Sequence, residues 1–135
     1  MFVAGHSAGG HLTAMAMNDR RVAGGIAISG IYDLEPIRLN YLNVKLGLDP
    51  AEAHRNSPIL HLPSQAGPLV VAYGSAELPE LRRQSVDYAQ AWIGRGLTGQ
   101  LLAVDGADHF TILESLADPD GASTLALTGM ALPSR

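Results

Sequence analysis

Four short apolar segments alternate with segments of helical pattern along this chain, and this alternation narrows the choice of folds more than any other feature. The apolar segments, predicted to be strands, are 1–4, 22–29, 68–73 and 99–104. The segments predicted to be helical are 8–18, 36–46, 50–54, 79–94, 110–117 and 122–132. Almost uniformly apolar strands separated by helices are typical of a parallel sheet covered on both faces, with right-handed crossovers. We therefore expect an α/β fold with a parallel sheet of about four strands and flanking helices.

The composition fits one globular unit and argues against several classes of partner. Of the 135 residues, 47% are hydrophobic, which is enough for a core. The formal net charge is −4 and no run of basic residues exceeds two, so we expect neither nucleic acid nor a membrane as partner. The absence of cysteine excludes disulfides, thiolate metal sites and a cysteine nucleophile. No segment has the length of a membrane span and no signal peptide is visible, so we expect a cytoplasmic protein.

The pentapeptide G-H-S-A-G at 5–9 stands where the first predicted strand meets the first predicted helix. A serine at such a turn takes a strained backbone conformation that presents its hydroxyl. Small residues are expected two positions on either side of Ser7, where strand and helix backbones come close, and these are Gly5 and Gly9. The N–H of Ala8 lies at the N-terminus of the predicted helix, where the helix dipole stabilises a developing oxyanion. The pattern therefore predicts a nucleophilic Ser7 with Ala8 as an oxyanion donor.

Groups able to act as nucleophile, acid and base follow three of the four predicted strands. Ser7 follows the first strand, Glu77 the third and His109 the fourth. In a parallel sheet these strand ends share one edge, where ligands bind. A serine hydroxyl needs a base to take its proton, an imidazole suits that role near neutral pH, and a carboxylate fixes the imidazole tautomer. We therefore predict a catalytic triad of Ser7, Glu77 and His109.

Other carboxylates near these strand ends are open as the acid of the triad. They are Glu80 at the start of the predicted helix 79–94, and Asp105 and Asp108 in the loop that carries His109. Glu77 is preferred because it lies in the turn directly after the third strand, three residues beyond Gly74.

Three further residues are predicted to contact the substrate. His6 adjoins the nucleophile, and Tyr32 and Asp33 lie in the loop after the second strand. For Asp33, capping of the helix that follows is an equal alternative. His6 and His11 have no third ligand beside them, so no metal site is predicted, and no organic cofactor is implied.

Several stretches resemble a known family. GHSAGGHL at 5–12 resembles the hormone-sensitive-lipase-like branch of the α/β-hydrolases. SGIYDLEPI at 29–37, ELPELRRQS at 77–85 and GADHFTILESLADPDG at 106–121 resemble the arylformamidase (kynurenine formamidase) group and its esterase relatives. The resemblance runs over nearly all of the chain, and its Ser–acid–His order is that of these hydrolases. The acid in the family is commonly Asp, so Glu77 departs from the pattern.

The resemblance implies a serine hydrolase that cleaves N-formyl aryl amides through an acyl-enzyme. A general carboxylesterase of the same fold is the alternative, with a small-molecule ester in place of the amide. The family also carries an upstream H-G-G-x-W-type loop that supplies further oxyanion donors, and this sequence does not contain it. We therefore expect residues 1–135 to form a single partial catalytic domain, the C-terminal part of an α/β-hydrolase fold.

A partial domain of this kind has consequences for activity and association. Without upstream strands, the first strand would leave a sheet edge exposed, which offers a route to homo-oligomers. A catalytically incompetent fragment or binding module is the alternative from another functional class.

Overall fold

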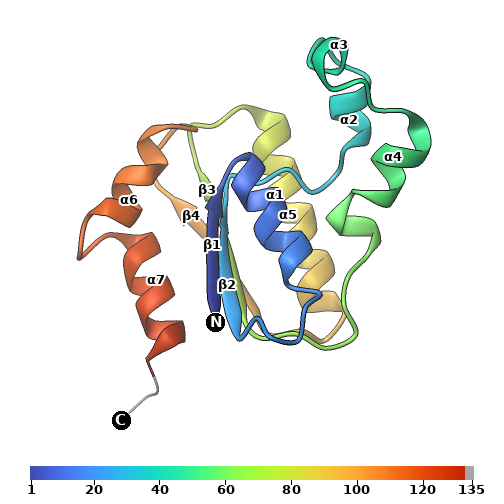
Figure 1. The fold of residues 1–135 in the computed structure, drawn as a ribbon. Coiled ribbons are helices and arrows are strands. Elements are labelled where there is room, and N and C mark those ends of the chain that lie inside the picture. The colour runs from blue at the N-terminus through green and yellow to red at the C-terminus, as the bar shows by residue number, and fades with distance from the viewer. Residues whose placement is uncertain (133–135) are drawn as a thin grey trace.

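Four parallel strands form the middle layer of the structure, a computed structural model that describes residues 1–132 (Figure 1). The strands are β1 (Phe2–His6), β2 (Gly24–Ile28), β3 (Leu69–Gly74) and β4 (Gly99–Val104). They lie in the order β1-β2-β3-β4, and each pairs in parallel with the next. All four carboxyl ends therefore meet at one edge of the sheet. The α/β class expected from the alternation is confirmed.

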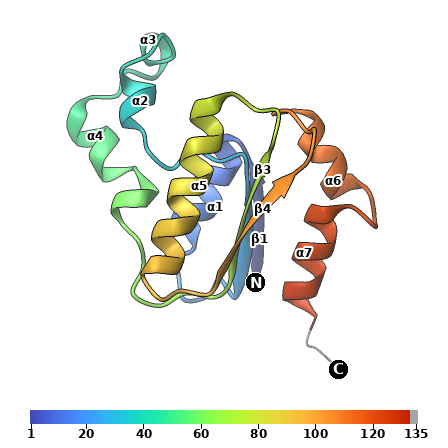
Figure 2. The same cartoon turned by 180° about the vertical axis from the view of Figure 1, so that it is seen from behind.

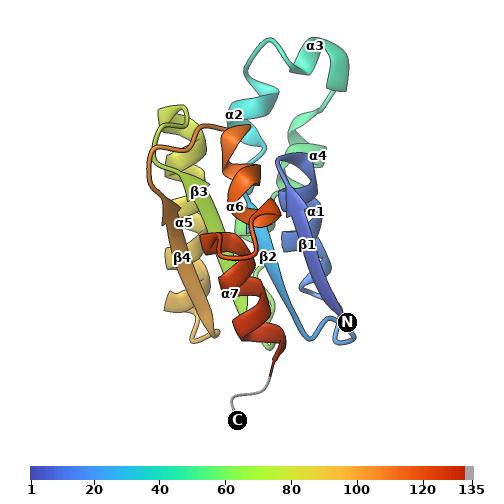
Figure 3. The same cartoon turned by 90° about the vertical axis from the view of Figure 1, so that its left-hand side faces the viewer.

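Helices cover both faces of this sheet. The helix α1 (Ala8–Ala16) and the helix α5 (Pro79–Gly94) pack on one face, whereas α6 (Glu114–Ala117) and α7 (Ala122–Ala131) lie over the other (Figure 2). Viewed onto that second face, α7 crosses the middle strands and leaves β1 at one side of the sheet (Figure 3). No helix within residues 1–132 is long and apolar enough to cross a membrane.

The long connection between β2 and β3 contains two short helices, α2 (Glu35–Arg38) and α3 (Asn43–Leu46), instead of the single helix expected at 36–46. The helix expected at 50–54 is present as α4 (Pro50–Arg55), and the 3₁₀ turn η1 (Pro58–Leu60) follows it. The break between α2 and α3 falls at Asn40, whose side-chain oxygen accepts the Leu42 N–H at 2.8 Å. Asparagine competes with helical hydrogen bonds in this way, so the expectation of one continuous helix was wrong.

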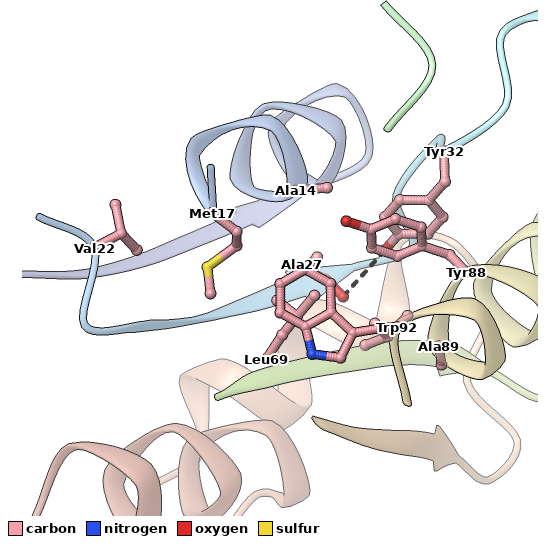
Figure 4. Packing of buried hydrophobic residues seen from close by; sticks show 10 residues of the cluster. Ala14, Met17, Val22, Ala27, Tyr32, Leu69, Tyr88, Ala89 and Trp92 are labelled. Atoms are coloured by element: carbon pink, nitrogen blue, oxygen red, sulfur yellow. Dashed lines mark hydrogen bonds between the residues drawn. The ribbon is translucent and has the colours of Figure 1, made fainter. Parts of the chain in front are cut away.

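The core has two parts, one on each face of the sheet. The part under α1 and α5 is built around the aromatic side chains of Tyr32, Tyr88 and Trp92 (Figure 4). The other part lies under α6 and α7 and contains Ile26, Ile28, Val70, Ala72 and Ile112. Successive residues of β2 and β3 serve opposite parts, as expected for strands covered on both faces.

The buried side of α5 is not uniformly apolar. Ile93 is half exposed, whereas Gln84 and Ser85 are fully buried. The buried stripe of α5 thus includes polar residues that an apolar pattern does not reveal.

The glycines around Ser7 differ in how tightly they are packed. A Cβ on Gly5 would overlap the Gly9 carbonyl and lie 2.8 Å from Thr13 Oγ1. A Cβ on Gly10 would lie 2.7 Å from Gly30 Cα, because α1 packs directly on the end of β2. A Cβ on Gly9, in contrast, would meet nothing within 4 Å. The expectation that Gly9 must be small for close packing was wrong, and Gly5 and Gly10 are the positions of close approach.

This difference predicts opposite effects for two matched substitutions. Gly5→Ala should lower the free energy of unfolding by about 1–3 kcal/mol, because backbone atoms must move to make room for the added methyl group. Gly9→Ala should leave it unchanged or raise it by up to about 1 kcal/mol, because alanine favours a helix. Urea unfolding of both variants measures the effects. Equal losses in the two variants would contradict the packing described here.

Candidate active site

Ser7 stands at the sharp turn between β1 and α1 with its backbone at φ 58° and ψ −116°. This conformation is costly for any residue with a Cβ. Two hydrogen bonds hold it: the Ser7 N–H donates to the Ile28 carbonyl at 2.9 Å, and the His11 N–H donates to the Ser7 carbonyl at 3.1 Å. The strained strand-to-helix turn expected from the pentapeptide is therefore present, with the serine at the carboxyl edge of the sheet.

Glu77 lies in the turn after β3, and its side chain is completely buried. Its Oε2 accepts the Gly74 N–H at 3.0 Å, and its own N–H donates to the Gly74 carbonyl at 3.1 Å. Hydrogen bonds to the backbone of this turn thus fix the position of the carboxylate. The second oxygen, Oε1, is left to face the loop after β4.

His109, in that loop, connects the other two groups. Its Nδ1 lies 2.7 Å from Glu77 Oε1, and its Nε2 lies 3.0 Å from Ser7 Oγ. A carboxylate only accepts hydrogen bonds, so Nδ1 carries the proton in this arrangement. In the neutral ring Nε2 then has a free lone pair and accepts the Ser7 hydroxyl. The structure therefore brings Ser7, His109 and Glu77 into one hydrogen-bonded chain.

The other carboxylates considered for the acid are engaged elsewhere. Glu80 pairs with Arg83 and accepts from Gln84, while Asp105 accepts the Ser75 hydroxyl at 3.2 Å. Asp108 accepts backbone N–H groups of its own turn, from Phe110 and Thr111, and these bonds hold the pKa of its carboxyl below the usual value. Among the candidates, Glu77 is thus the one that contacts the imidazole.

Two residues adjoining Ser7 differ in their hydrogen bonding. The Ala8 N–H makes no hydrogen bond within residues 1–132, so it is free to donate one to a ligand. The ring of His6 is not free, because its Nε2 lies 2.7 Å from the carbonyl oxygen of His109. His6 was predicted to contact the substrate, and its Nε2 already has a partner within the chain. The predicted substrate contact stays untested.

The side chain of Tyr32, which was predicted to border the substrate pocket, lies in the core instead. Its side chain is fully buried in the core and stacks on Tyr88, with ring centroids 4.2 Å apart and planes 3° from parallel (Figure 4). Burial also raises the pKa of the Tyr32 phenol. An aromatic residue that follows a strand can turn inward as readily as outward, and here the apolar ring fills the space beside α5.

Asp33, for which capping was the alternative, lies one residue before Leu34, the N-terminal cap residue of α2, and bonds the first residue of that helix. Its Oδ1 accepts the Glu35 N–H at 3.0 Å, at the start of α2. It also lines a hollow of about 270 Å³ between α2 and α4, together with residues such as His54 and Ser57. Its predicted contact with a substrate remains untested.

Gln84 is a residue of the site region that sequence analysis missed. Its Oε1 accepts the N–H groups of Tyr32 and Asp33 at 2.8 and 2.9 Å, and its Nε2 donates to the Asp33 carbonyl at 3.0 Å. A buried amide on α5 thus ties down the loop after β2. The available signal was a polar residue on the apolar stripe of a predicted helix.

Removal of this amide should destabilise the chain. Gln84→Met keeps the side-chain volume but leaves two backbone N–H groups without an acceptor, at a cost of about 1–3 kcal/mol each. Gln90→Met on the exposed side of α5 is the matched control and should change the unfolding free energy little. Urea unfolding compares the two. A Gln84→Met variant as stable as the control would show that the Gln84 hydrogen bonds contribute nothing.

Comparison with known proteins finds relatives in sequence and in structure. No protein-family model matches the chain. It is 35% identical to the kynurenine formamidase of Danio rerio and 38% identical to that of Salmo salar, in each case over 96% of this chain and 49% of the relative. The chain thus spans about half the length of the curated relatives it matches.

Solved structures share the fold of this chain. A Silicibacter sp. TM1040 protein with a proposed thioesterase assignment superposes with a TM-score of 0.82 at 29% identity, over 93% of this chain and 49% of that one. An esterase of Pyrobaculum calidifontis has the same fold, with a TM-score of 0.73 at 23% identity over 97% of this chain and 53% of that one. Over the half of these proteins that it spans, this chain is thus similar in sequence to kynurenine formamidases, and it has the fold of the matching part of α/β-hydrolase structures.

Proposed function

We propose that this chain carries the catalytic residues of a serine hydrolase that cleaves N-formyl aryl amides, such as N-formylkynurenine. Ser7 is the nucleophile, His109 the general base and Glu77 the acid that orients the imidazole. The observation that carries this proposal is the hydrogen-bonded chain from Glu77 through His109 to Ser7. The identity to two kynurenine formamidases supports the substrate class.

The proposed reaction begins with a proton transfer. His109 Nε2 takes the proton of Ser7 Oγ as the oxygen attacks the formyl carbon, which gives a tetrahedral oxyanion. The free N–H of Ala8 is placed to donate to this oxyanion at the start of α1. The imidazolium then returns its proton to the amine, the C–N bond breaks, and a formyl group remains on Ser7. Water activated by His109 releases formate and restores the serine.

The burial of Glu77 bears on this mechanism. A carboxylate removed from water stabilises the imidazolium that forms next to it more strongly than an exposed one would. The Gly74 N–H holds Oε2, the oxygen that does not face His109, and this bond restrains rotation of the carboxylate. The extra methylene of Glu relative to Asp lets this side chain bond its own turn and still reach the ring in the β4–α6 loop.

An ester substrate is the second candidate. The solved relative at 29% identity has a proposed thioesterase assignment, and the same triad chemistry opens an ester or an amide. Turnover of p-nitrophenyl acetate without turnover of N-formylkynurenine would favour this alternative. A chain that neither hydrolyses these compounds nor reacts with a fluorophosphonate would instead be a binding module.

Substitutions in the proposed triad should abolish turnover without unfolding the chain. Ser7→Ala and Glu77→Gln should each lower kcat/KM for N-formylkynurenine by about 10⁴-fold or more, because nucleophile or tautomer control is lost. Ser64→Ala, at an exposed position outside the site, is the control and should keep full activity. Steady-state kinetics measures all three. Full activity in Ser7→Ala would rule out this residue as the nucleophile.

The free side of β1 supports a second proposal, that copies of this chain associate through this edge of the sheet. In the described residues β1 pairs with β2 alone, and Phe2 and Ala4 are exposed. A charge on an edge strand opposes such pairing. Ala4→Lys should therefore shift the mass from light scattering towards the monomer, whereas Val44→Lys on α3 should not. Equal masses for wild type and Ala4→Lys would contradict association through β1.

A further inference from the structure

We propose that His6 is a positioning residue that fixes the β4–α6 loop so that the His109 ring faces Ser7. The inference rests on the proposed function, since it concerns the base of that reaction. It differs from a substrate-binding role because the His6 ring acts through the backbone of His109.

The contact that carries the inference joins residues 103 positions apart. His6 Nε2 lies 2.7 Å from the His109 carbonyl oxygen, and the two ring centroids are 4.7 Å apart. A carbonyl oxygen only accepts, so Nε2 must be the donor. This proton is therefore committed to the loop, and the same nitrogen cannot serve as a second base for Ser7.

His6 is well placed to act as an anchor. It is the last residue of β1 and pairs with Ile28 in the sheet, so its backbone belongs to the rigid middle layer. It also directly precedes Ser7, so that the anchor of the loop and the nucleophile share one short segment. Catalytic geometry is held best by side chains based on strands or helices.

The loop is also tied at its other side, to the turn after β3. The Ala76 N–H donates to the Ala107 carbonyl at 3.0 Å, and the Gly106 N–H donates to Ser75 Oγ at 2.8 Å. His6 supplies the matching bond on the β1 side. The backbone of the loop therefore spans the sheet edge from β3 to β1, as the His109 ring does from Glu77 to Ser7.

Loss of this anchor should impair the chemical step more than binding. Without the donor, the His109 carbonyl loses its partner and the loop can shift relative to β1. A displacement of about 1 Å in a catalytic group costs on the order of 100-fold in rate. We therefore expect His6→Leu to lower kcat for N-formylkynurenine by about 10- to 100-fold with little change in KM.

A conservative variant separates positioning from general damage. His6→Gln retains an N–H donor at a similar reach and should restore most of kcat. His61→Leu, which removes an exposed histidine outside the site, is the control and should keep kcat near the wild-type value. The unfolding midpoint in urea of each variant shows whether it is folded under the assay conditions.

A measurement that needs no substrate makes the test independent of the proposed function. In the wild type, the His109 Nδ1 proton that is bonded to Glu77 should give a protected, strongly downfield NMR signal. His6→Leu should weaken this signal or speed its exchange with solvent, and His6→Gln should preserve it. This outcome would support the inference even if wild type does not hydrolyse N-formylkynurenine.

Three results would overturn the inference. The first is an unchanged Nδ1 signal and unchanged kcat in His6→Leu. The second is a rise in KM at constant kcat, which would indicate substrate contact. The third is an equal loss of kcat in His6→Gln and His6→Leu, which would show that the N–H donor is not what matters.

Discussion

The backbone of Ser7 has a conformation that this residue would not adopt by itself, and the organisation of the site depends on it. A non-glycine residue in such a region costs about 1–3 kcal/mol, which the surrounding structure must offset. The Ile28 carbonyl holds the turn from the sheet side, and the first turn of α1 holds it from the helix side. The close approach at Gly5 and Gly10 lets α1 leave the sheet at once after the serine. The hydroxyl is thereby exposed at the carboxyl edge, where the other strand ends also arrive.

Besides the strained turn, the site requires that Glu77 and His109, distant in sequence, lie close to the Ser7 hydroxyl. Parallel strands joined by crossovers place the ends of β1, β3 and β4 on one edge although their residues are far apart in sequence. Short hydrogen bonds between successive turns then set the distances: the turn after β3 holds Glu77 and one side of the β4–α6 loop, and His6 bonds the other side. His109 is thus fixed by contacts of its backbone as well as of its ring. The site is a property of the sheet edge as a whole and not of the pentapeptide alone.

Much of the fold could be predicted from the sequence, because strands and crossover helices have strong apolar patterns. The predicted segments 99–104 and 79–94 coincide with β4 and α5, and the parallel sheet was expected from the alternation. The meeting of Ser7, Glu77 and His109 could be predicted because the carboxyl ends of parallel strands lie at the same edge of the sheet. The contact of Glu77 rather than Glu80 or Asp105 with the imidazole depends on turn geometry that spacing does not specify.

These wrong or missed expectations share one physical cause, which is that a local sequence pattern does not specify what surrounds a residue in three dimensions. Tyr32 turns into the core, and a Cβ on Gly9 would meet open space although Gly9 mirrors Gly5 about Ser7 in the pentapeptide. Gln84 is buried because its amide satisfies the backbone of a loop some 50 residues earlier, a long-range contact that local periodicity does not contain.

The central claim is that Ser7, activated by His109 and oriented by its strained turn, is the nucleophile. The crystal structure of this chain after reaction with a fluorophosphonate tests it most directly. We predict one phosphonyl group on Ser7 Oγ, with a phosphonyl oxygen within hydrogen-bond distance of the Ala8 N–H and the His109 Nδ1 still bonded to Glu77. A label on another residue, or an unmodified Ser7 in a correctly folded chain, would contradict the account.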